Sequence, residues 1–338
     1  MGRTTVYNKI VDKDKLQMIN RENIELQKDF LEYLESVDRS PKTIYQYNND
    51  LNIFFVWNLD FNDNKDFVDI KKRDLIKFQK YCLNNLGWSP ARVRRVKSCI
   101  SSMSTYIENI LDDEYEDFRS VVNKIESPIN EKVREKTVIP DEKVDYLLKT
   151  LTEQEEYEKA CAVAIAVYSG MRKAELLQMK ESYFGDDKLV FDGAMYVTEK
   201  IRTKGRGKQG KQLQKYILVE AKPYIDNWIK KRKELGVDID NLFVSKENDK
   251  WIARKSIDYW VKSCSEIIGM PFYFHSLRHF IVSKFCRLNL PSEVIREYLG
   301  WSDISLISVY NDNKATDNFG KFFTSEGVVK QEENNIFK

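Results

Sequence analysis

Residues 160–175 read ACAVAIAVYSGMRKAE, and this stretch determines how the second half of the chain folds. Residues 160–168 are apolar on every side of a helix, which indicates a buried helix rather than a surface helix. The pair Ser169-Gly170 ends that helix, and Arg172 begins the next one. An arginine therefore lies just after the glycine that ends the longest apolar run of the chain.

The region that follows this stretch predicts a mixed unit. Short apolar runs at 188–191, 195–198 and 215–219 are separated by turn residues and indicate strands of a small antiparallel sheet. Helical periodicity then returns in five segments, at 222–235, 254–268, 275–288, 291–299 and 302–310.

The first part of the chain predicts a helical bundle. Apolar residues recur at helical spacing from residue 22 to 34, and further helices are expected after Ser40-Pro41, Lys72 and Ser89-Pro90. Serine accepts bonds from the free amides at a helix start, and proline suits the first helical position. Residues 1–20 are polar and lack a clear period, and 127–139 have linker composition.

These patterns define the expected fold class, which is mainly α with a small antiparallel β-sheet (α+β). Five segments are expected: an N-terminal extension at 1–20, a helical unit at 21–126, a linker at 127–139, a second unit at 140–326 and a flexible tail at 327–338.

The composition excludes several classes of protein. The 338 residues carry a formal net charge of +2, and the longest apolar run is too short to cross a bilayer. No secretory signal is visible at the N-terminus, so a cytoplasmic protein without a membrane partner is expected. Five scattered cysteines argue against a disulfide framework or a zinc site, and reduced packing residues are expected instead.

Positive charge is concentrated in two stretches. Residues 200–215 hold seven basic side chains and no acidic one. A second group lies at 92–97. Local clusters of this kind are better evidence of a nucleic-acid partner than the average charge.

The first chemical signal is the arginine at the end of the buried helix. Glu175 follows Arg172 by one turn and is placed to pair with it. An anion there would meet a guanidinium and helix-terminal amides. The alternative is an ordinary helix corner with a surface ion pair.

The second signal is a basic hairpin. A two-residue Gln-Gly turn in Lys208-Gln209-Gly210-Lys211 is expected to place Lys208 across from Lys211 at the tip. Such a tip could bring an ammonium to a DNA phosphate, although a solvated hairpin remains the alternative.

The third signal is His275-Ser276-Leu277-Arg278, which places a histidine and an arginine on one side of a helix. Histidine exchanges protons near neutral pH, and arginine presents a planar fork to phosphate. His279 is expected on a different face. A capping or core histidine is the alternative.

The fourth signal runs from Leu299-Gly300-Trp301-Ser302 to Tyr310. Gly300 is expected to end one helix and Ser302 to begin another, with Tyr310 about two turns later. The alternative is a tyrosine that completes an apolar face.

In combination these motifs resemble the catalytic signature of the tyrosine recombinases, a family that includes phage integrases, Xer recombinases and Cre. Arg278 and Tyr310 are 32 positions apart, and Trp301 and Tyr310 are nine apart, which is similar to the family's layout. The resemblance covers residues 137–326, and more loosely the first unit with its Ser-Pro-Lys-Thr helix start at 40–43. It implies an N-terminal SAM-like core-binding domain followed by a catalytic domain.

The resemblance also implies the chemistry. Arg172, His275 and Arg278 would bind the scissile phosphate, with Glu175 orienting Arg172. Tyr310 would attack and become bonded to a DNA 3′-phosphate, and Lys208 would protonate the departing 5′-oxygen. The reaction would need neither a metal ion nor another cofactor such as ATP.

Two positions depart from the family pattern. Trp301 stands where most members have histidine, and an indole donates one hydrogen bond but cannot relay a proton. It is therefore expected to contact phosphate and pack. The hairpin is long and rich in lysine, so Lys204 is a rival for the role of Lys208.

The implied partner is double-stranded DNA at recombination core sites, held by a homo-tetramer on two sites, with accessory directionality or bending proteins. Expected DNA contacts outside the catalytic set are Lys42, Arg92, Arg94, Arg95, Lys97, Lys200, Arg202, Arg206 and Lys211. The segment 319–323 is expected to form a short aromatic helix that packs on its own domain or on a neighbouring subunit.

A phage or other mobile-element integrase is the favoured member of the family. A type IB topoisomerase-like enzyme and a catalytically inactive DNA-binding protein are the rival readings.

Overall fold

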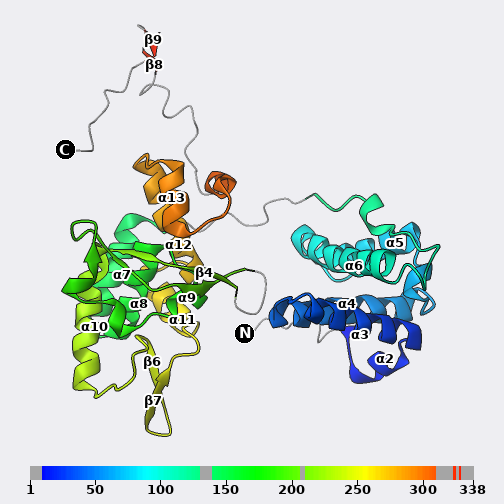
Figure 1. Ribbon diagram of the computed structural model, residues 1–338, viewed down its shortest axis with the longest axis horizontal. Helices are drawn as coiled ribbons and strands as arrows, with labels where there is room; N and C mark the ends of the chain where they lie inside the picture. Colours follow the sequence, from blue (N-terminus) through cyan, green and yellow to red (C-terminus); the bar gives the residue numbers. More distant parts are fainter. Residues whose placement is uncertain (1–9, 130–138, 206–209, 310–322, 325–326, 329–338) are drawn as a thin grey trace. The chain divides into compact units, whose positions relative to one another are not determined.

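The computed structural model describes residues 10–129, 139–205, 210–309, 323–324 and 327–328 (Figure 1). The chain divides into two compact units, one formed mainly by Met1–Glu135 and the other by Lys136–Lys204 and Lys211–Lys338. Within the described residues, no helix combines the length and the apolar character that crossing a membrane requires.

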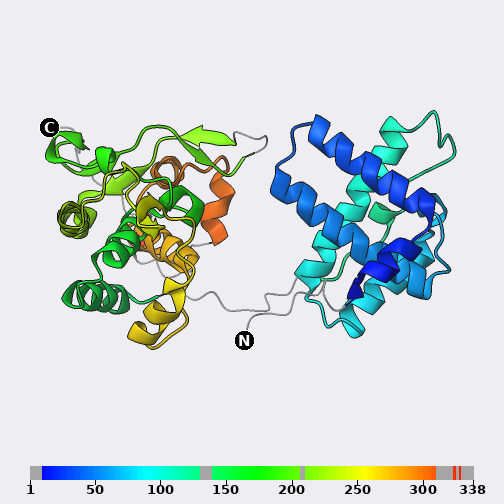
Figure 2. The ribbon, with the colours of Figure 1, turned by 90° about the horizontal axis from the view of Figure 1, so that it is seen from below.

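The first unit is a bundle of helices. Its α-helices are α2 (Lys13–Met18), α3 (Arg21–Ser36), α4 (Pro41–Phe61), α5 (Lys72–Asn84) and α6 (Pro90–Ile110), with 3₁₀ turns at Phe67–Asp69 and Val122–Lys124. In Figures 1 and 2 the blue helices α3 and α4 run next to each other, and α4 and α3 also contact α6.

The predicted helix starts of this unit are confirmed. The side chain of Ser40 accepts a hydrogen bond from the Thr43 N–H, and the side chain of Ser89 accepts one from the Arg92 N–H. Each serine is followed by proline at the first helical position, where the missing N–H is not needed.

Aromatic side chains fill the core of the bundle. Phe54 and Phe78 meet edge to face with ring centroids 5.0 Å apart, and Trp57 lies 5.1 Å from Phe78. Helix α2 was not evident from sequence periodicity because it is only six residues long, yet Val11 and Ile19 at its two ends are buried in the same core.

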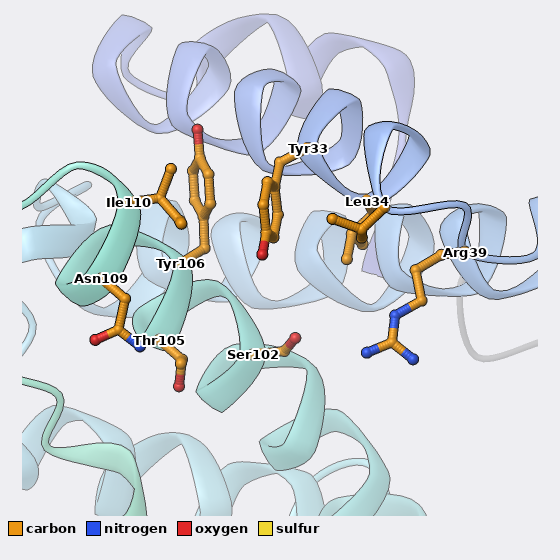
Figure 3. Close-up of a pocket in the computed structure, with 9 residues that line it drawn as sticks. Tyr33, Leu34, Arg39, Ser102, Thr105, Tyr106, Asn109 and Ile110 are labelled. Atoms are coloured by element: carbon orange, nitrogen blue, oxygen red, sulfur yellow. The ribbon is translucent and has the colours of Figure 1, made fainter. Parts of the chain in front are cut away.

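A cavity of about 460 Å³ opens between the end of α3 and α6 (Figure 3). The rings of Tyr33 and Tyr106 stand 4.9 Å apart within it, and Arg39 and Asn109 supply polar groups at its wall.

The second unit is built around the predicted buried helix. Its α-helices are α7 (Asp141–Glu153), α8 (Tyr157–Ser169), α9 (Lys173–Leu176), α10 (Lys222–Glu234), α11 (Trp260–Ile268), α12 (Phe274–Arg287) and α13 (Ser292–Leu299). Helix α8 contacts α7, α9, α10 and α12. Its residues from Ala160 to Val167 are all buried, so this helix forms the centre of the unit.

The three predicted strands form one antiparallel sheet. The strands are β1 (Leu189–Val190), β2 (Met195–Val197) and β5 (Tyr216–Leu218), in the order β1-β2-β5. Tyr196 of β2 pairs with Ile217 of β5, and both side chains are buried. A separate pair, β3 (Ile201–Thr203) and β4 (Lys211–Leu213), extends from this region.

Several predicted elements of the second unit differ from those observed. Residues 254–259 precede α11 instead of belonging to it, and the Arg254 guanidinium binds Glu158 of α8. The segment predicted as a helix at 302–310 is a 3₁₀ helix at Ile304–Val309. The hairpin of β6 (Val244–Glu247) and β7 (Lys250–Ala253) was not predicted, because its turn, Asn248-Asp249, has no glycine.

The end of the chain is described only in two short strands, β8 (Phe323–Thr324) and β9 (Gly327–Val328). The expectation of a short helix at 319–323 is therefore wrong for Phe323, and residues 319–322 lie outside the described residues.

The cysteines are all unbridged thiols. Cys82, Cys99, Cys161 and Cys264 are buried, and Cys286 is half-buried. Burial raises the pKa of Cys82 to about 12 and that of Cys264 to about 11. The burial of four of the five agrees with the expected packing role.

Gly170 ends α8 at a point where no side chain fits. Its φ is +61°, and an added Cβ would lie 2.7 Å from Leu299 Cδ2 and 3.0 Å from Ile281 Cγ2. Helices α12 and α13 therefore approach the end of α8 at a distance that only glycine permits.

We expect Gly170→Ala to destabilise the second unit by about 2–5 kcal/mol, from left-handed backbone strain together with overpacking. Gly269→Ala is the matched control, because Gly269 also ends a helix with φ +68° but has open space around it. Denaturant unfolding should show the larger loss for Gly170→Ala. Equal losses would mean that the close approach at Gly170 is not a constraint.

Candidate active site

Arg172 is held at the beginning of α9 by Glu175. Its Nη1 donates to Glu175 Oε1 over 2.9 Å, and its backbone N–H donates to Glu175 Oε2 over 3.0 Å. The ion pair expected from the spacing of these two residues is present. The Glu175 side chain is 2% exposed and that of Arg172 is 34% exposed. A buried carboxylate therefore fixes the guanidinium, which stays partly exposed to solvent.

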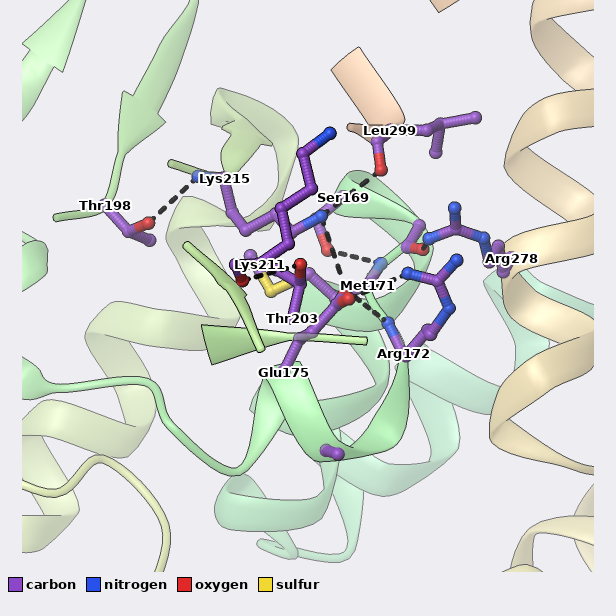
Figure 4. A network of polar contacts seen from close by, with 12 residues as sticks. Ser169, Met171, Arg172, Glu175, Thr198, Thr203, Lys211, Lys215, Arg278 and Leu299 are labelled. Carbon is purple, nitrogen blue, oxygen red and sulfur yellow. Dashed lines mark hydrogen bonds and ion pairs between the residues drawn. The ribbon is translucent and has the colours of Figure 1, made fainter. Parts of the chain in front are cut away.

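Lys215 is a further cation at the same point, and the sequence analysis did not single it out. Its Nζ lies 3.4 Å from Glu175 Oε2 and donates to the carbonyl of Leu299 over 3.2 Å (Figure 4). A buried lysine could not be separated from its basic neighbours by composition. The signal available in the sequence was its place at the start of the predicted strand 215–219, directly before an apolar run.

Arg278 approaches from α12. It is 1% exposed, and its Nη1 donates to the carbonyl of Gly170 over 2.5 Å, two residues before Arg172. Trp301, also buried, has its ring centroid 5.2 Å from the Arg278 guanidinium carbon. This cation–π contact agrees with the packing role expected for Trp301.

His275 lies one turn before Arg278 on α12. Loss of hydration among the surrounding protein atoms lowers the pKa of the imidazole, and the positive charges of Arg278 and Arg172 lower it further. The ring is therefore neutral at pH 7, and both guanidiniums are close enough to disfavour its protonation.

The expectation that His279 lies on a different face from His275 is wrong. The two imidazole rings meet edge to face with centroids 4.9 Å apart. Residues four apart on a helix share a face, which explains the contact.

The electrostatics of this point favour an anion. Arg172 and Lys215 pair with the carboxylate of Glu175, and Arg278 is a third cation whose charge acts on Lys215. Burial opposes ionisation of Glu175, but Lys215 and the bonds from Arg172 outweigh it and keep the pKa of the carboxyl below its usual value. One negative charge among three positive charges leaves the site ready for a phosphate.

The remaining catalytic candidates are placed only in part. Lys208 and Tyr310 lie outside the described residues. Lys204 is exposed at the end of β3. Among the residues that the structure describes, no group of three or more His, Cys, Asp or Glu side chains could hold a metal ion.

The predicted register of the basic hairpin is wrong. Lys211 pairs with Thr203, so Lys208 is not its cross-strand partner and the connection spans residues 204–210. The Gln-Gly pair was a valid turn signal, but the glycines at 205, 207 and 210 favour a longer loop over strand structure.

The basic residues of α6 are engaged within the first unit. Arg92 and Arg95 both donate to the buried carboxylate of Asp50, over 2.7 and 2.8 Å, and burial raises the pKa of that carboxyl to about 6. Arg94 donates to the carbonyl of Pro128, and Lys97 donates to the Ser127 hydroxyl over 3.1 Å. Their expected role in DNA contact remains a prediction.

Of the other expected DNA contacts, four have exposed side chains, namely Lys42, Lys200, Arg202 and Lys211. The backbone of Arg202 is fixed by two hydrogen bonds with the Gln178 side chain. Arg206 lies outside the described residues.

Comparison with known families agrees with this geometry. The chain matches the phage integrase family over residues 137–317, and residues 26–117 match the N-terminal SAM-like domain of phage integrases. The first match covers more than half of the chain, which therefore belongs to the phage integrase family, the tyrosine recombinases. The fold class expected from the sequence, mainly α with a small antiparallel sheet, is confirmed.

A relative gives the same result, and solved structures share the fold. The chain is 31% identical over 244 residues to the SPbeta prophage-derived recombinase-like protein YomM of Bacillus subtilis (strain 168), covering 70% of each chain. Its fold is similar to the Tn1549 transposon integrase in complex with circular intermediate DNA, with a TM-score of 0.64, 15% identity, and coverage of 88% of this chain and 98% of that one. It is also similar to the XerH site-specific recombinase bound to its palindromic difH substrate, with a TM-score of 0.61, 15% identity and coverage of 93% and 89%.

We expect Glu175→Gln to destabilise the second unit by about 3–5 kcal/mol, because it leaves the buried Lys215 without a counter-charge. The folded-state pKa of Glu175 is lowered, so the stabilisation by its charge is complete above the ordinary value of 4.5 and is lost as the pH falls through the lowered value. The difference between wild type and variant should therefore shrink below pH 4.5.

The control for this prediction is Glu153→Gln, which removes one member of an exposed pair with Lys149 and should change stability by no more than about 0.5 kcal/mol. Urea unfolding at a series of pH values checks both variants. A Glu175→Gln deficit that stays constant from pH 7 to pH 3 would contradict the charge-based account.

Proposed function

We propose that this protein is a site-specific DNA recombinase that cleaves and rejoins strands through a 3′-phosphotyrosyl intermediate at Tyr310. The observation that carries the proposal is the convergence of Arg172, Arg278 and His275 on one positively charged point. Membership of the phage integrase family supports the same chemistry.

In the cleavage step, the phenolic oxygen of Tyr310 bonds to the scissile phosphorus, and the bond from phosphorus to the 5′-oxygen breaks. Arg172 and Arg278 bind the non-bridging oxygens, where negative charge grows in the transition state. The neutral imidazole of His275 accepts a proton or hydrogen-bonds the phosphate, and Lys208 protonates the 5′-oxygen.

Rejoining reverses these events. A 5′-hydroxyl attacks the phosphotyrosyl bond, and the phenol leaves with a proton. The energy of the phosphodiester stays in the ester to Tyr310, so the mechanism consumes no ATP. The two guanidiniums supply the positive charge that a metal ion supplies in other phosphoryl-transfer sites, so the mechanism requires no metal.

The biological setting follows from the relatives. YomM is prophage-derived, and the Tn1549 integrase belongs to a transposon. We therefore favour a mobile-element integrase, acting as a homo-tetramer on two core sites with accessory bending or directionality proteins. The Tn1549 and XerH structures contain DNA, which supports duplex DNA as the partner here.

We expect wild-type protein to form a covalent adduct with a nicked suicide DNA substrate carrying its core site, and Tyr310→Phe to form none, because the variant has no nucleophilic oxygen. Denaturing gels and mapping of the DNA-linked peptide measure this. Tyr146→Phe, an exposed tyrosine on α7, is the control and should keep wild-type activity.

The rival readings predict other outcomes. A type IB topoisomerase-like enzyme would form the adduct but no Holliday junctions from two sites. An inactive DNA-binding protein would form no adduct, either as wild type or as Tyr310→Phe. That result would overturn the proposal.

The identity of the general acid can be tested with a sulfur leaving group. We expect Lys208→Ala to slow cleavage of ordinary DNA by roughly 100- to 10,000-fold, the range typical of general acid catalysis. DNA with a 5′-bridging sulfur should be cleaved at nearly the wild-type rate, because a thiolate leaves without protonation.

Lys204→Ala is the matched variant on the same connection. It should slow both substrates equally or neither of them. A loss with ordinary DNA that sulfur rescues in Lys204→Ala, and not in Lys208→Ala, would assign the role to Lys204.

A further inference from the structure

Lys215 lies between β4 and β5 with its side chain inside the second unit. Only 2% of the side chain is exposed. Its backbone is fixed by Thr198, whose hydroxyl accepts from the Lys215 N–H and whose N–H donates to the Lys215 carbonyl, each over 3.0 Å. An ammonium is costly to bury unless it is paired, so the partners of its Nζ explain its position.

Those partners belong to two separate elements. Glu175, at 3.4 Å from Nζ, lies in α9 and holds Arg172. The carbonyl of Leu299, at 3.2 Å, ends α13. Figure 4 shows Lys215 between Glu175 and Leu299, with dashed lines to both. One buried cation therefore connects the arginine-bearing corner with the end of α13.

The chain turns directly over this ammonium. Gly300 has φ +66°, and a Cβ added there would lie 3.3 Å from Lys215 Nζ and 2.7 Å from Leu213 Cδ1. The next residue, Trp301, packs over the Arg278 guanidinium. Lys215 thus contacts the chain at the point where the segment that leads toward Tyr310 begins.

We propose that Lys215 is a positioning residue of the catalytic site, whose buried ammonium holds the Glu175 carboxylate toward Arg172 and ties the end of α13 to the same point. This inference rests on the proposed function and adds a residue that lies outside the recognised motifs. Lys215 acts through its partners, because its Nζ is enclosed and contacts Glu175 and the Leu299 carbonyl.

The charges around the pair predict a specific signature. Lys215 faces Glu175, Arg278 and Arg172, and Glu175 faces Lys215 and Arg172. Of the groups that favour the charged form of Glu175, Lys215 is the largest contributor. Removing its charge raises the pKa of Glu175, so cleavage should fail at a higher pH as the solution is acidified.

The test compares Lys215→Met, which keeps the length of the side chain and removes the charge, with Lys262→Met. Lys262 is an exposed lysine of α11 that also pairs with a glutamate, Glu266, at 3.8 Å. Adduct formation on nicked suicide DNA is measured across a pH series in the full chain. We expect Lys215→Met to slow cleavage roughly 100-fold, as when a distant substitution displaces a reacting group by about 1 Å.

Three further results are expected. In the plot of cleavage rate against pH, the loss of rate at acid pH begins at a higher pH in Lys215→Met than in wild type. Lys262→Met has the wild-type rate and the wild-type pH dependence. The double variant Lys215→Met with Glu175→Gln is no slower than the slower single variant, because both changes remove one interaction. A rate within twofold of wild type with an unshifted profile, or losses that multiply in the double variant, would overturn the proposal.

A folding defect is separated by two measurements. Lys215→Arg keeps the charge and should recover most of the rate and the wild-type pH dependence. Denaturant unfolding gives the loss of unfolding free energy in the two single variants and in the double variant. The loss in the double variant should be much smaller than the sum of the two single losses. Losses that add would overturn the proposal without reference to DNA. If wild type forms no adduct while this coupling is present, the proposed function fails and the contact of Lys215 stands.

Discussion

The carboxylate of Glu175 holds two cations, Arg172 and Lys215, at a place where burial alone would exclude the charges of Glu175 and Lys215. A buried charge is tolerated only when its partners and hydrogen bonds replace water. Glu175 meets this condition because both oxygens accept bonds from Arg172 and one also faces Lys215. The excess positive charge, to which Arg278 adds, is what makes the corner suited to a DNA phosphate.

The apolar helix α8 gives this corner its rigidity. It is buried along its length, and it ends at Gly170, where α12 and α13 come within contact distance of the backbone. The carbonyl of Gly170 then accepts the bond from Arg278. Guanidiniums from α9 and α12 are thus held by backbone and buried groups, which is the support a site needs to bind a transition state rather than a substrate.

Local sequence signals predicted the features that depend on local physics. Serine-proline pairs identified two helix starts, the continuous apolar run identified α8, and the three-residue spacing identified the pair of Arg172 with Glu175. The ordered set of motifs then led to the family.

Features set by distant contacts were not predictable in this way. The partners of Lys215 come from α9 and α13, and no sequence pattern around residue 215 predicts them. The register of β3 with β4 depends on how a glycine-rich connection closes, and the 3₁₀ form of residues 304–309 depends on tertiary surroundings that a periodic pattern does not contain. The face of His279, in contrast, follows from helical spacing alone, because residues four apart on a helix share a face.

The distribution of thiols has a practical consequence. Alkylating reagents attack the thiolate, and burial keeps Cys82, Cys99, Cys161 and Cys264 protonated and enclosed. Cys286 is the half-buried thiol, and it lies near the end of α12, the helix that also carries His275 and Arg278. A maleimide dye would therefore react there first, giving the native chain a fluorescent reporter on the helix that carries His275 and Arg278, with no cysteine engineering beforehand.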